Sequence, residues 1–492
     1  MRGFGHQGLL GSLLGAALAL GAAQAASAET LQDAISLAYE SNPTLQQQRA
    51  QLRALDETYV QALAGYRPTL GLSGTASYER YAPSFASSLT SRTAQATLTA
   101  TQPLYTGGRV SAAVRAAEAQ VLSGRETLRA QEAAILQQVI GAYVDVRRDT
   151  AIVDIRRANV EVIKAQLDET TARFNVGQLT RTDVATVSAQ YAQARANLAG
   201  ALGQLKTSRA AYLAVIGRPP GTLEAESPLP GAPKSLDDAF DTAEARNPSL
   251  LSASLKEQSD LALVAQARAA RMPTVSASAS YSQGAALGAY PDNNNQNTVV
   301  AGVTVTQPLF SGGLVSSQIR AALEQDNADR QALEQARRNT IQSVSVAWNQ
   351  ILTARASLSA SQEQKDAAAL AFEGVKQEFR AGLRTVFEYV QAEQSVRDAE
   401  LSVVNAGHDA YVADAALLAA VGRLDVASLG LGARPYDPAR NFDKVRGGLS
   451  TVLDPVAGAL DRINPNGAPA TLDPHRGAVL GPLKADADTT QK

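Results

Sequence analysis

Few residues of this sequence have the types and spacing that chemistry on a substrate requires. Its 492 residues include no cysteine, which excludes disulfides, thiolate–metal sites, a cysteine nucleophile and a lipid-modified N-terminal cysteine. Histidine occurs three times, and His6 and His475 lie near the two ends of the chain. No Ser-His-Asp set, pocket of paired carboxylates or phosphate-binding loop is recognisable, so we expect no catalysis, cofactor or metal. His408 and the single tryptophan, Trp348, are expected to serve packing.

Composition and charge narrow the remaining classes. Hydrophobic residues make up 45% of the chain and charged residues 19%, so the chain can bury a large core. The formal net charge of -2 leaves no basic excess to neutralise phosphates. Nucleic-acid binding is therefore not expected.

The first 28 residues have the pattern of a secretory signal peptide. Arg2 supplies the positive start, residues 9–20 an apolar run too short to span a bilayer, and residues 26–28 a small-residue cleavage site. The G-x-G-x-x-G spacing that begins at Gly3 belongs to this leader, so it does not indicate dinucleotide binding. No later run approaches the ~20 apolar residues of a membrane helix, so the exported chain is either soluble or crosses a membrane as strands.

The C-terminal end differs in composition from the rest of the chain. Residues 435–492 carry seven of the twenty prolines and show no sustained periodicity. This composition predicts a mostly disordered tail. Deleting residues 450–492 is accordingly expected to leave assembly intact.

An internal duplication with a constant offset organises the chain between leader and tail. The segment TQPLYTGG, which begins at Thr101, recurs as TQPLFSGG from Thr306, an offset of 205 residues. We therefore predict a first repeat at residues 29–229 and a second at residues 230–434. The same offset relates Asn42-Pro43 to Asn247-Pro248, Phe174 to Phe379, and Gly177 to Gly382.

Each repeat opens with signals for two successive helices. Thr30 precedes Asp33, and Ser235 precedes Asp238, by the three residues that let a hydroxyl accept from the free N–H groups of a first turn. The Asn-Pro pairs then start a second helix, with asparagine as the cap and proline in the first helical position.

Two segments in each repeat alternate between apolar and small polar residues, as strands with one apolar face do. Each runs about 9 to 11 residues, the length that a tilted strand needs to cross a bilayer. The Ser- and Asn-rich links at residues 82–92 and 284–297 are expected to be exposed loops. An ordinary half-buried sheet is the alternative. The segments are residues 69–78, 93–101, 274–281 and 298–306.

Each second strand is followed by a long proline-free stretch, which predicts long helices. Each continuous rod would run about 100 Å at ~1.5 Å per residue, more than a compact domain accommodates. Gly177 and Gly382 break the two rods at equivalent points, so each repeat ends in a helical hairpin. The predicted helices are residues 109–174 and 183–216 in the first repeat, and 314–379 and 388–421 in the second.

The returning helices carry residues at spacings of seven, which predicts a supercoiled seam. In the second repeat, alanine at the partner positions allows helix backbones to approach closely, as in a wall of laterally packed helices. An isolated extended coiled coil is the alternative. The seam positions are Val184, Tyr191, Leu198, Leu205 and Tyr212, and Tyr389, Val396, Val403, Ala410 and Leu417.

Four strands per chain cannot close a membrane sheet, because the smallest barrels have ~8 strands. Oligomerisation is therefore required. Two copies would give a barrel of about eight strands filled by side chains, whereas three would give about twelve strands and room for a channel. The hydroxylated inner face of the strands favours a wet lumen.

The duplicated plan and its motifs resemble a known family. The plan of two strands and a long hairpin, the Gln-Pro-Leu-x-x-Gly-Gly junctions, and the Phe-x-x-Gly-x-x-Thr-x-x-Asp/Glu turns are similar to those of the TolC family of outer-membrane export ducts, over residues 30–434. The turns read Phe174, Gly177, Thr180 and Asp183, and Phe379, Gly382, Thr385 and Glu388. The resemblance implies a mainly α fold with membrane β structure, in which a homotrimeric 12-stranded β-barrel is continued by a 12-helix periplasmic α-barrel.

The resemblance also implies location and partners. It places the chain in the outer membrane of a Gram-negative cell, extending into the periplasm, with the hairpin turns facing a periplasmic adaptor (membrane fusion) protein. An inner-membrane ABC transporter or proton-driven pump would supply the energy. Residues 180–183 and 435–438 resemble the branch that serves type I protein secretion. Small-molecule and multidrug efflux is one alternative, and a periplasmic coiled-coil scaffold that never enters a membrane is the other.

Gate residues follow from the same resemblance. By motif position, Asp183 and Arg384 resemble a salt-bridge pair that holds the periplasmic end closed. Glu388 stands where the family typically has an aspartate ring, and Gln391 occupies a second acidic position one turn on, so a weaker cation preference is expected. Phe379 stands where some members have tyrosine, which removes a hydroxyl-mediated bond.

Overall fold

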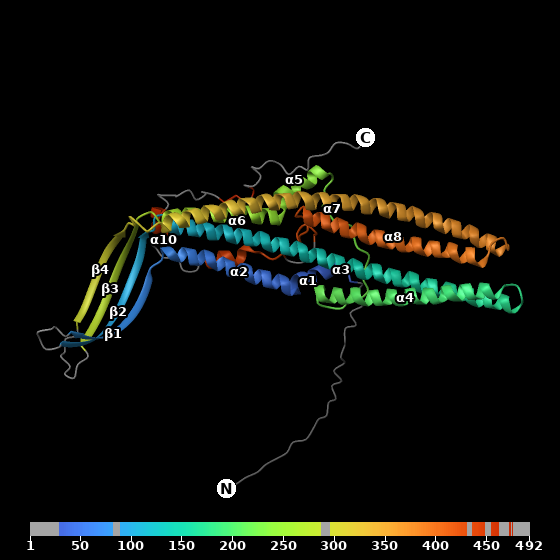
Figure 1. The fold of residues 1–492 in the computed structure, drawn as a ribbon, viewed down its shortest axis with the longest axis horizontal. Coiled ribbons are helices and arrows are strands. Elements are labelled where there is room, and N and C mark those ends of the chain that lie inside the picture. Colours follow the sequence, from blue (N-terminus) through green and yellow to red (C-terminus); the bar gives the residue numbers. More distant parts are fainter. Residues whose placement is uncertain are drawn as a thin grey trace, which may run out of the picture.

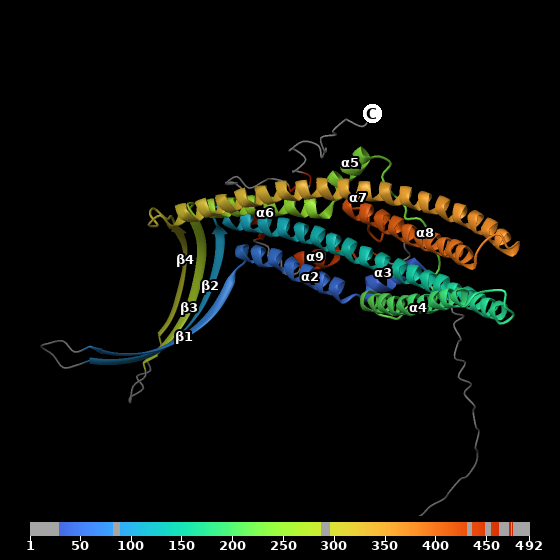
Figure 2. The ribbon, with the colours of Figure 1, turned by 45° about the vertical axis from the view of Figure 1, so that its right-hand side comes forward.

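The computed structural model describes residues 29–81, 89–286, 296–430, 435–447, 454–461, 472–473 and 475, and the signal peptide predicted at residues 1–28 lies outside them. The molecule is elongated, with a sheet at one end and the tips of two helical hairpins at the other (Figure 1). A second view shows the strands bending away from the helices (Figure 2).

Helices and strands follow the same order in both repeats: two short helices, two strands and a long helical hairpin, as predicted. The first repeat holds α1 (Leu31–Ser41), α2 (Pro43–Leu63), the short 3-10 helix η1 (Ala64–Tyr66), β1 (Thr69–Tyr81), β2 (Leu89–Tyr105), α3 (Arg109–Asn175) and α4 (Arg181–Ile216). The second holds α5 (Leu236–Arg246), α6 (Pro248–Ala269), β3 (Thr274–Ala286), β4 (Gln296–Thr306), α7 (Leu314–Arg380) and α8 (Val386–Ala420).

The predicted caps start the short helices of each repeat. Thr30 and Asp33 form a capping box at α1, in which the Asp33 amide donates to the Thr30 hydroxyl at 3.1 Å. Asn42 and Asn247 cap α2 and α6 with their side-chain oxygens, and a proline follows each in the first helical turn. Their side-chain amides also donate to a backbone carbonyl at the end of the returning helix in the same repeat, at 3.1 and 2.8 Å. The duplicated asparagine therefore ties the short helices to the hairpins.

One antiparallel sheet of four strands joins the two repeats, in the order β1-β2-β3-β4. The middle pair, β2 and β3, crosses between repeats, with Thr99 opposite Ser280. β1 and β4 are the edge strands of this sheet. The single chain thus ends its sheet with one edge from each repeat.

The strands are longer than the alternating pattern predicts. Residues 89–92 and 284–286 were expected in loops, as were residues 296–297, and all of them belong to strands. The prediction is wrong there because each further pair in an antiparallel ladder gains backbone hydrogen bonds whatever the side chains are. Of the expected loops, residues 82–88 and 287–295 lie outside the described residues.

Among the residues that the structure describes, nothing covers the apolar face of the sheet. Leu72 is 77% exposed, Val299 75% and Val303 64%. An ordinary half-buried sheet would cover such residues with the chain's own helices, so that alternative does not describe this sheet.

The long helices α3 and α7 contain 67 residues each, about 100 Å at ~1.5 Å per residue. α3 is the central rod, in contact with α2, α4, α6 and α8. α7 packs against α8 and α6. Within the described ranges, none of the helices combines the length and the apolar character needed to cross a membrane.

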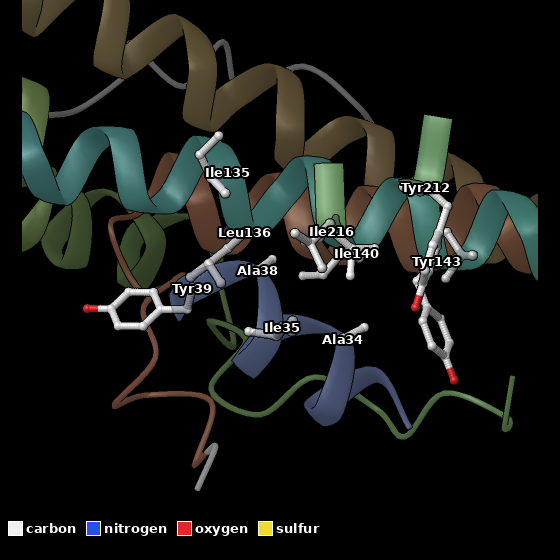
Figure 3. Close-up of a cluster of buried hydrophobic side chains, with 14 of the residues drawn as sticks. Ala34, Ile35, Ala38, Tyr39, Ile135, Leu136, Ile140, Tyr143, Tyr212 and Ile216 are labelled. Carbon is white, nitrogen blue, oxygen red and sulfur yellow. The ribbon is translucent and has the colours of Figure 1, made fainter. Parts of the chain in front are cut away.

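The main apolar core lies where α1 packs onto α3 and α4 (Figure 3). Ile35 of α1, Ile140 and Tyr143 of α3, and Tyr212 of α4 are buried there. Tyr143 donates from its hydroxyl to the Glu29 carbonyl at 2.8 Å, and Tyr212 donates to the Glu29 carboxylate at 2.7 Å. The two rings therefore hold the start of the first repeat against its hairpin.

The C-terminal ends of the seams predicted for the returning helices are buried, and the other seam positions are half-buried. Leu205 and Tyr212 are buried in α4, and Ala410 and Leu417 are buried in α8. The partner alanines of α8 at positions 399, 406 and 413 are buried as well, which lets α7 and α8 approach closely.

The C-terminal tail contains two short helices at residues 439–446 and 454–461, which its composition did not predict. α9 (Ala439–Arg446) packs on α2, with the ring centroids of Phe442 and Tyr59 5.0 Å apart. α10 (Asp454–Asp461) lies at the start of α3, beside the strand ends (Figure 1). Composition does not reveal these helices because their anchoring residues are too few to form a periodic pattern.

Candidate gate at the hairpin tips

Two turns join the long helices to the returning helices, at the end of the molecule far from the strands (Figure 2). The first tip spans residues 176–180 between α3 and α4, and the second tip spans residues 381–385 between α7 and α8. Every site residue predicted from the sequence lies in one of these tips or in the adjoining helical turns.

Glycine allows both tips to form. Gly177 and Gly382 have φ of +79° and +77°, a left-handed conformation that a Cβ disfavours. Each glycine amide donates to the carbonyl of the phenylalanine three residues earlier, Phe174 at 2.9 Å and Phe379 at 3.0 Å. The F-x-x-G spacing therefore satisfies carbonyls that the helix end leaves without intrahelical partners.

Asp183 completes the capping box of the first tip. Its carboxylate accepts from the Thr180 amide at 2.9 Å and from the Thr180 hydroxyl at 2.8 Å. The Asp183 amide donates back to the Thr180 hydroxyl at 3.2 Å. The backbone bond and then the hydroxyl bond from Thr180 hold the pKa of Asp183 below its usual value. The carboxylate thus stabilises the start of α4.

The second tip has the same capping box and an added arginine. The Glu388 carboxylate accepts from the Thr385 amide and hydroxyl, both at 2.9 Å. Arg384 donates to Glu378 and to Glu388, both at 2.7 Å. The Thr385 amide, followed by Arg384, lowers the pKa of Glu388 to about 2, and Glu378 and Glu388 raise the pKa of Arg384. Arg384 thus joins the last turns of α7 to the first turn of α8.

Asp183 and Arg384 do not meet within one chain. Among the residues that the structure describes, Arg384 pairs with Glu378 and Glu388, while the Asp183 carboxylate bonds to Thr180. A latch between Asp183 and Arg384 stays a prediction, and it requires a contact between chains.

Two acidic residues near the second tip are not found from the sequence alone. Glu378 is the second carboxylate of Arg384, and its signal is a glutamate on each side of one arginine. Glu393 is buried on α8, 3.8 Å from Arg397, and burial raises its pKa. Its position three residues after the buried Val390 places it on the inward face of α8.

An apolar layer behind the tips holds the two hairpins together. Phe379 and Tyr389 lie with their ring centroids 5.0 Å apart, and the Arg173 guanidinium lies 5.6 Å from the Phe379 ring centre. Val187 of α4 and Val390 of α8 are buried in the same cluster. The second tip therefore packs against the first repeat of its own chain.

The outer surface of the tips is apolar as well as charged. Val176 is 70% exposed, Leu383 77% and Phe387 57%. Phe174 is also exposed, and so is Gln391 on α8, one turn after the capping box. An apolar surface at the end of an elongated molecule is a candidate contact site for another protein.

His408 and Trp348 lie away from the tips. Trp348 is half-buried against the cluster formed by α5, α7 and α8. His408 bonds through Nε2 to Asp145 of α3 at 3.0 Å and through Nδ1 to Asp409 at 2.9 Å. His408 therefore ties α8 to α3.

In the part of the chain that the structure describes, no group of three His, Asp or Glu residues could hold a metal ion.

Comparison with known proteins covers both repeats. The outer membrane efflux protein family matches residues 34–218 and 239–423, once in each repeat. The chain is 34% identical to the outer membrane efflux protein BepC of Brucella suis over 423 residues, which are 86% of this chain and 92% of BepC. It is 27% identical to the outer membrane protein TolC of Escherichia coli over 436 residues, which are 85% of this chain and 87% of TolC.

A solved structure shows the same fold. The CmeC outer membrane channel of Campylobacter jejuni superposes with a TM-score of 0.72 and 14% sequence identity. The superposition covers 85% of this chain and 90% of that chain. The shared fold thus covers most of the length of both chains.

Proposed function

Because this chain belongs to the outer membrane efflux protein family, we propose that it is the export duct of a tripartite assembly across the cell envelope. It is an outer membrane channel of the TolC family that extends into the periplasm, and members of this family are channels rather than enzymes. In the proposed assembly, substrate passes from an inner-membrane transporter through this duct to the outside. The observation that carries the proposal is the match of the family to both repeats.

The proposed duct is a homotrimer. β1 and β4 end the four-stranded sheet, and each presents backbone groups that the edge of a neighbouring copy can pair with. Three copies would close about twelve strands into a barrel with room for a channel. The helical hairpins of the three copies would close into a helical barrel on the periplasmic side of the strands. The bare apolar face of the sheet supports contact with lipid on the outside.

The hairpin tips would form the periplasmic entrance. In this proposal, Glu388 and Gln391 line the constriction, and Arg384 holds the second tip in the shape that it has in the single chain. In the closed ring, Arg384 would exchange Glu378 or Glu388 for Asp183 of a neighbouring copy. Engagement of the partner proteins would release that pair and open the entrance.

The exposed end of the tips would receive a periplasmic adaptor protein. Val176, Leu383 and Phe387 offer apolar area beside the turn glycines, and burying such area would favour docking. The proposed contact residues predicted from the sequence are Phe174, Gly177, Thr180, Phe379, Gly382 and Thr385.

The first candidate cargo is exported polypeptide, delivered by an ABC transporter in a type I secretion complex. The turn at residues 180–183 and the segment at residues 435–438 support it. In that segment, the ring centre of Tyr436 lies 4.8 Å from the Arg49 guanidinium. The Tyr436 amide donates to the Tyr39 hydroxyl at 2.9 Å. The second candidate is efflux of small molecules by a proton-driven pump. It is favoured because BepC and the matching family are both described as efflux proteins.

Deletion of the gene, with restoration as the control, separates the two cargo classes. Loss of particular polypeptides from the culture medium, with unchanged sensitivity to antibiotics and dyes, would identify protein secretion. Increased sensitivity with an unchanged set of secreted polypeptides would identify efflux. A deletion strain with neither defect would contradict the proposed export function.

A further inference from the structure

The C-terminal helix α10 supplies a capping carboxylate at the start of α3. Gly108 precedes α3 and has no side chain to accept from the N–H groups of the first turn. Asp461, at the end of α10, is fully buried. Its carboxylate accepts from the amides of Thr106 at 2.8 Å, Gly108 at 2.9 Å and Ser111 at 3.3 Å. The C-terminal segment is thus part of the first junction, which we define as residues 106–108 between β2 and α3.

The first junction also packs closely on the second repeat. A Cβ added to Gly107 would lie 2.5 Å from the Cβ of Met272 and 3.3 Å from the carbonyl oxygen of Ala269. Only glycine leaves room for this approach, and its φ of +69° also favours glycine. The contact therefore joins the strand-to-helix connection of one repeat to the end of α6 in the other.

The second junction, residues 311–313 between β4 and α7, has no such neighbour in the described part of the chain. A Cβ added to Gly312 would meet nothing within 4 Å, although its φ of +59° keeps the same left-handed conformation. Leu309 is 92% exposed and Phe310 is 89% exposed. At Gly312 the backbone thus has the conformation that accommodates a close neighbour at Gly107, but the described residues of the chain do not provide that neighbour.

The duplication identifies the residues that should fill this space. The offset of 205 maps Ala269 and Met272, which pack on the first junction, onto Ala64 and Arg67 of the first repeat. Within one chain these two residues adjoin β2 and α10, at the far side of the sheet from β4. A second copy of this chain would therefore supply them.

α10 packs against residues 64–67, the segment that is expected to approach the second junction of another copy. Arg67 pairs with Asp454 of α10 at 3.4 Å, and the Tyr66 hydroxyl donates to Asp461 at 3.3 Å. If residues 64–67 of one copy face the second junction of another, α10 of that copy lies beside the same junction.

We propose that α10 bridges neighbouring copies of this chain. Through Asp461 it caps α3 of its own chain, and through Val456 and Leu460 it covers Leu309 and Phe310 of the next chain. Val456 is 55% exposed and Leu460 40% exposed, and their spacing of four residues places them on one side of the helix. The inference rests on the proposed homotrimer. It assigns the C-terminal segment a role in assembly, opposite to the expectation that the tail is dispensable.

Disulfide cross-linking tests this contact directly, because the natural chain contains no cysteine. The full-length protein carrying Leu460→Cys and Phe310→Cys is expected to form disulfide-linked dimers and trimers when outer membranes are oxidised. Leu460→Cys combined with Leu370→Cys is the matched control. Leu370 is 78% exposed but lies near the opposite end of α7, so this pair is expected to stay unlinked.

A second cysteine pair tests the homotrimer by itself. The observed pair Thr99–Ser280 maps by the offset onto Thr304 of one copy and Thr75 of the next. Thr75→Cys with Thr304→Cys is therefore expected to cross-link the edge strands β1 and β4 of neighbouring copies. Linkage of this pair without linkage of the Leu460–Phe310 pair overturns the bridge and leaves the homotrimer standing. Failure of both pairs overturns the proposed assembly together with the bridge.

Heat-induced dissociation of the purified trimer gives an independent readout. Truncation after residue 461 is expected to keep the dissociation temperature of the wild type, and truncation after residue 453 to lower it. Since the shorter chain also loses the cap at α3, a variant with Val456→Ser and Leu460→Ser keeps Asp461 and removes only the apolar face. An unchanged dissociation temperature for this variant overturns the bridge.

Discussion

The two strand-to-helix junctions end segments of nearly the same sequence, TQPLYTGG and TQPLFSGG, but have opposite surroundings. In the first, Gly107 packs against Met272 and α10 caps the following helix. In the second, a Cβ on Gly312 would meet open space. The duplication thus copied both sides of the contact, but among the described residues only the first junction meets its partner segment within the chain. The exposed second junction therefore marks the surface at which copies of the chain are proposed to meet.

The two hairpin tips differ in their own residues rather than in their surroundings. Their backbone is the same, but their charges are not. Thr180 and Thr385 both accept in a capping box. The second tip adds Arg384 between two glutamates, whereas the equivalent position in the first tip is Leu179. Ion pairs that can control the shape of the entrance are therefore concentrated in the second repeat.

The largest expected difference between the repeats lies where the returning helices end. Gly217 and Gly422 are equivalent residues with φ of +92° and +73°. A Cβ on Gly422 would overlap the backbone carbonyl of Arg246, whereas the nearest atom to a Cβ on Gly217 is Ser41 Oγ at 3.8 Å. We expect Gly217→Ala to cost about 1–2 kcal/mol of left-handed strain. Gly422→Ala should cost roughly 1–3 kcal/mol more, because the backbone must move.

Thermal unfolding of the two variants, followed by circular dichroism, measures this difference. The wild type and Gly217→Ala serve as references, since both keep the contact with Arg246. Equal unfolding temperatures for the two variants would show that the repeats do not differ at this point.

A difference of the same order, and no larger because a side chain rather than the backbone must move, is expected at the two junctions. Gly107→Ala should lower the stability of the folded chain by roughly 1–3 kcal/mol, because its Cβ would press on Met272. Gly312→Ala meets no neighbour in the single chain, so its overpacking should appear only in the assembled protein. The measurement is the dissociation temperature of the trimer beside the unfolding of the dissociated chain. A trimer unaffected by Gly312→Ala would place the second junction outside the interface.

The smallest effect is a pH dependence that only the second repeat should show. Burial lowers the pKa of His408, but hydrogen bonds to Asp145 and Asp409 outweigh it, so the pKa is raised despite the nearby Arg148. Because the pKa of His408 is higher in the folded chain, its protonation stabilises the folded state. This contribution is complete below the ordinary pKa of about 6.5 and is lost as the pH rises through the folded pKa. The equivalent residue of α4 is Gly203.

Unfolding temperatures at a series of pH values check this contribution. We expect the stability of the wild type to fall above about pH 6.5 relative to that of His408→Gln, which keeps a polar side chain but does not titrate. Parallel pH profiles for the two proteins would mean that folding leaves the pKa of His408 unchanged, which would contradict the raised pKa.

Features set by local residue types could be predicted from the sequence. Asn42 and Asn247 act as caps, and Gly177 and Gly382 form the turns, because each function depends on one residue type and its immediate backbone. The long helices could be predicted for the same reason, since proline is absent from them.

Contacts over long sequence separations could not be predicted in this way. Asp461 bonds to Thr106 across 355 positions, and nothing near either residue indicates the other. The strand ends depend on pairing partners rather than on composition, so residues 89–92 were misplaced in a loop. At the second tip, Glu378 is recognised as a partner of Arg384 only when the turn brings the two together.

Single-channel conductance in a planar bilayer tests the central claim most directly, with wild type, Arg384→Ala and Arg355→Ala compared as detergent-purified proteins. Arg355 pairs with Asp414 at 2.9 Å midway along the second hairpin, so its replacement removes a similar ion pair away from the tip. A gate at the second tip predicts small, cation-preferring steps for wild type and Arg355→Ala, and larger steps for Arg384→Ala. Identical steps in all three would contradict a gate at the second tip, and a purified trimer that forms no channel would contradict the duct itself.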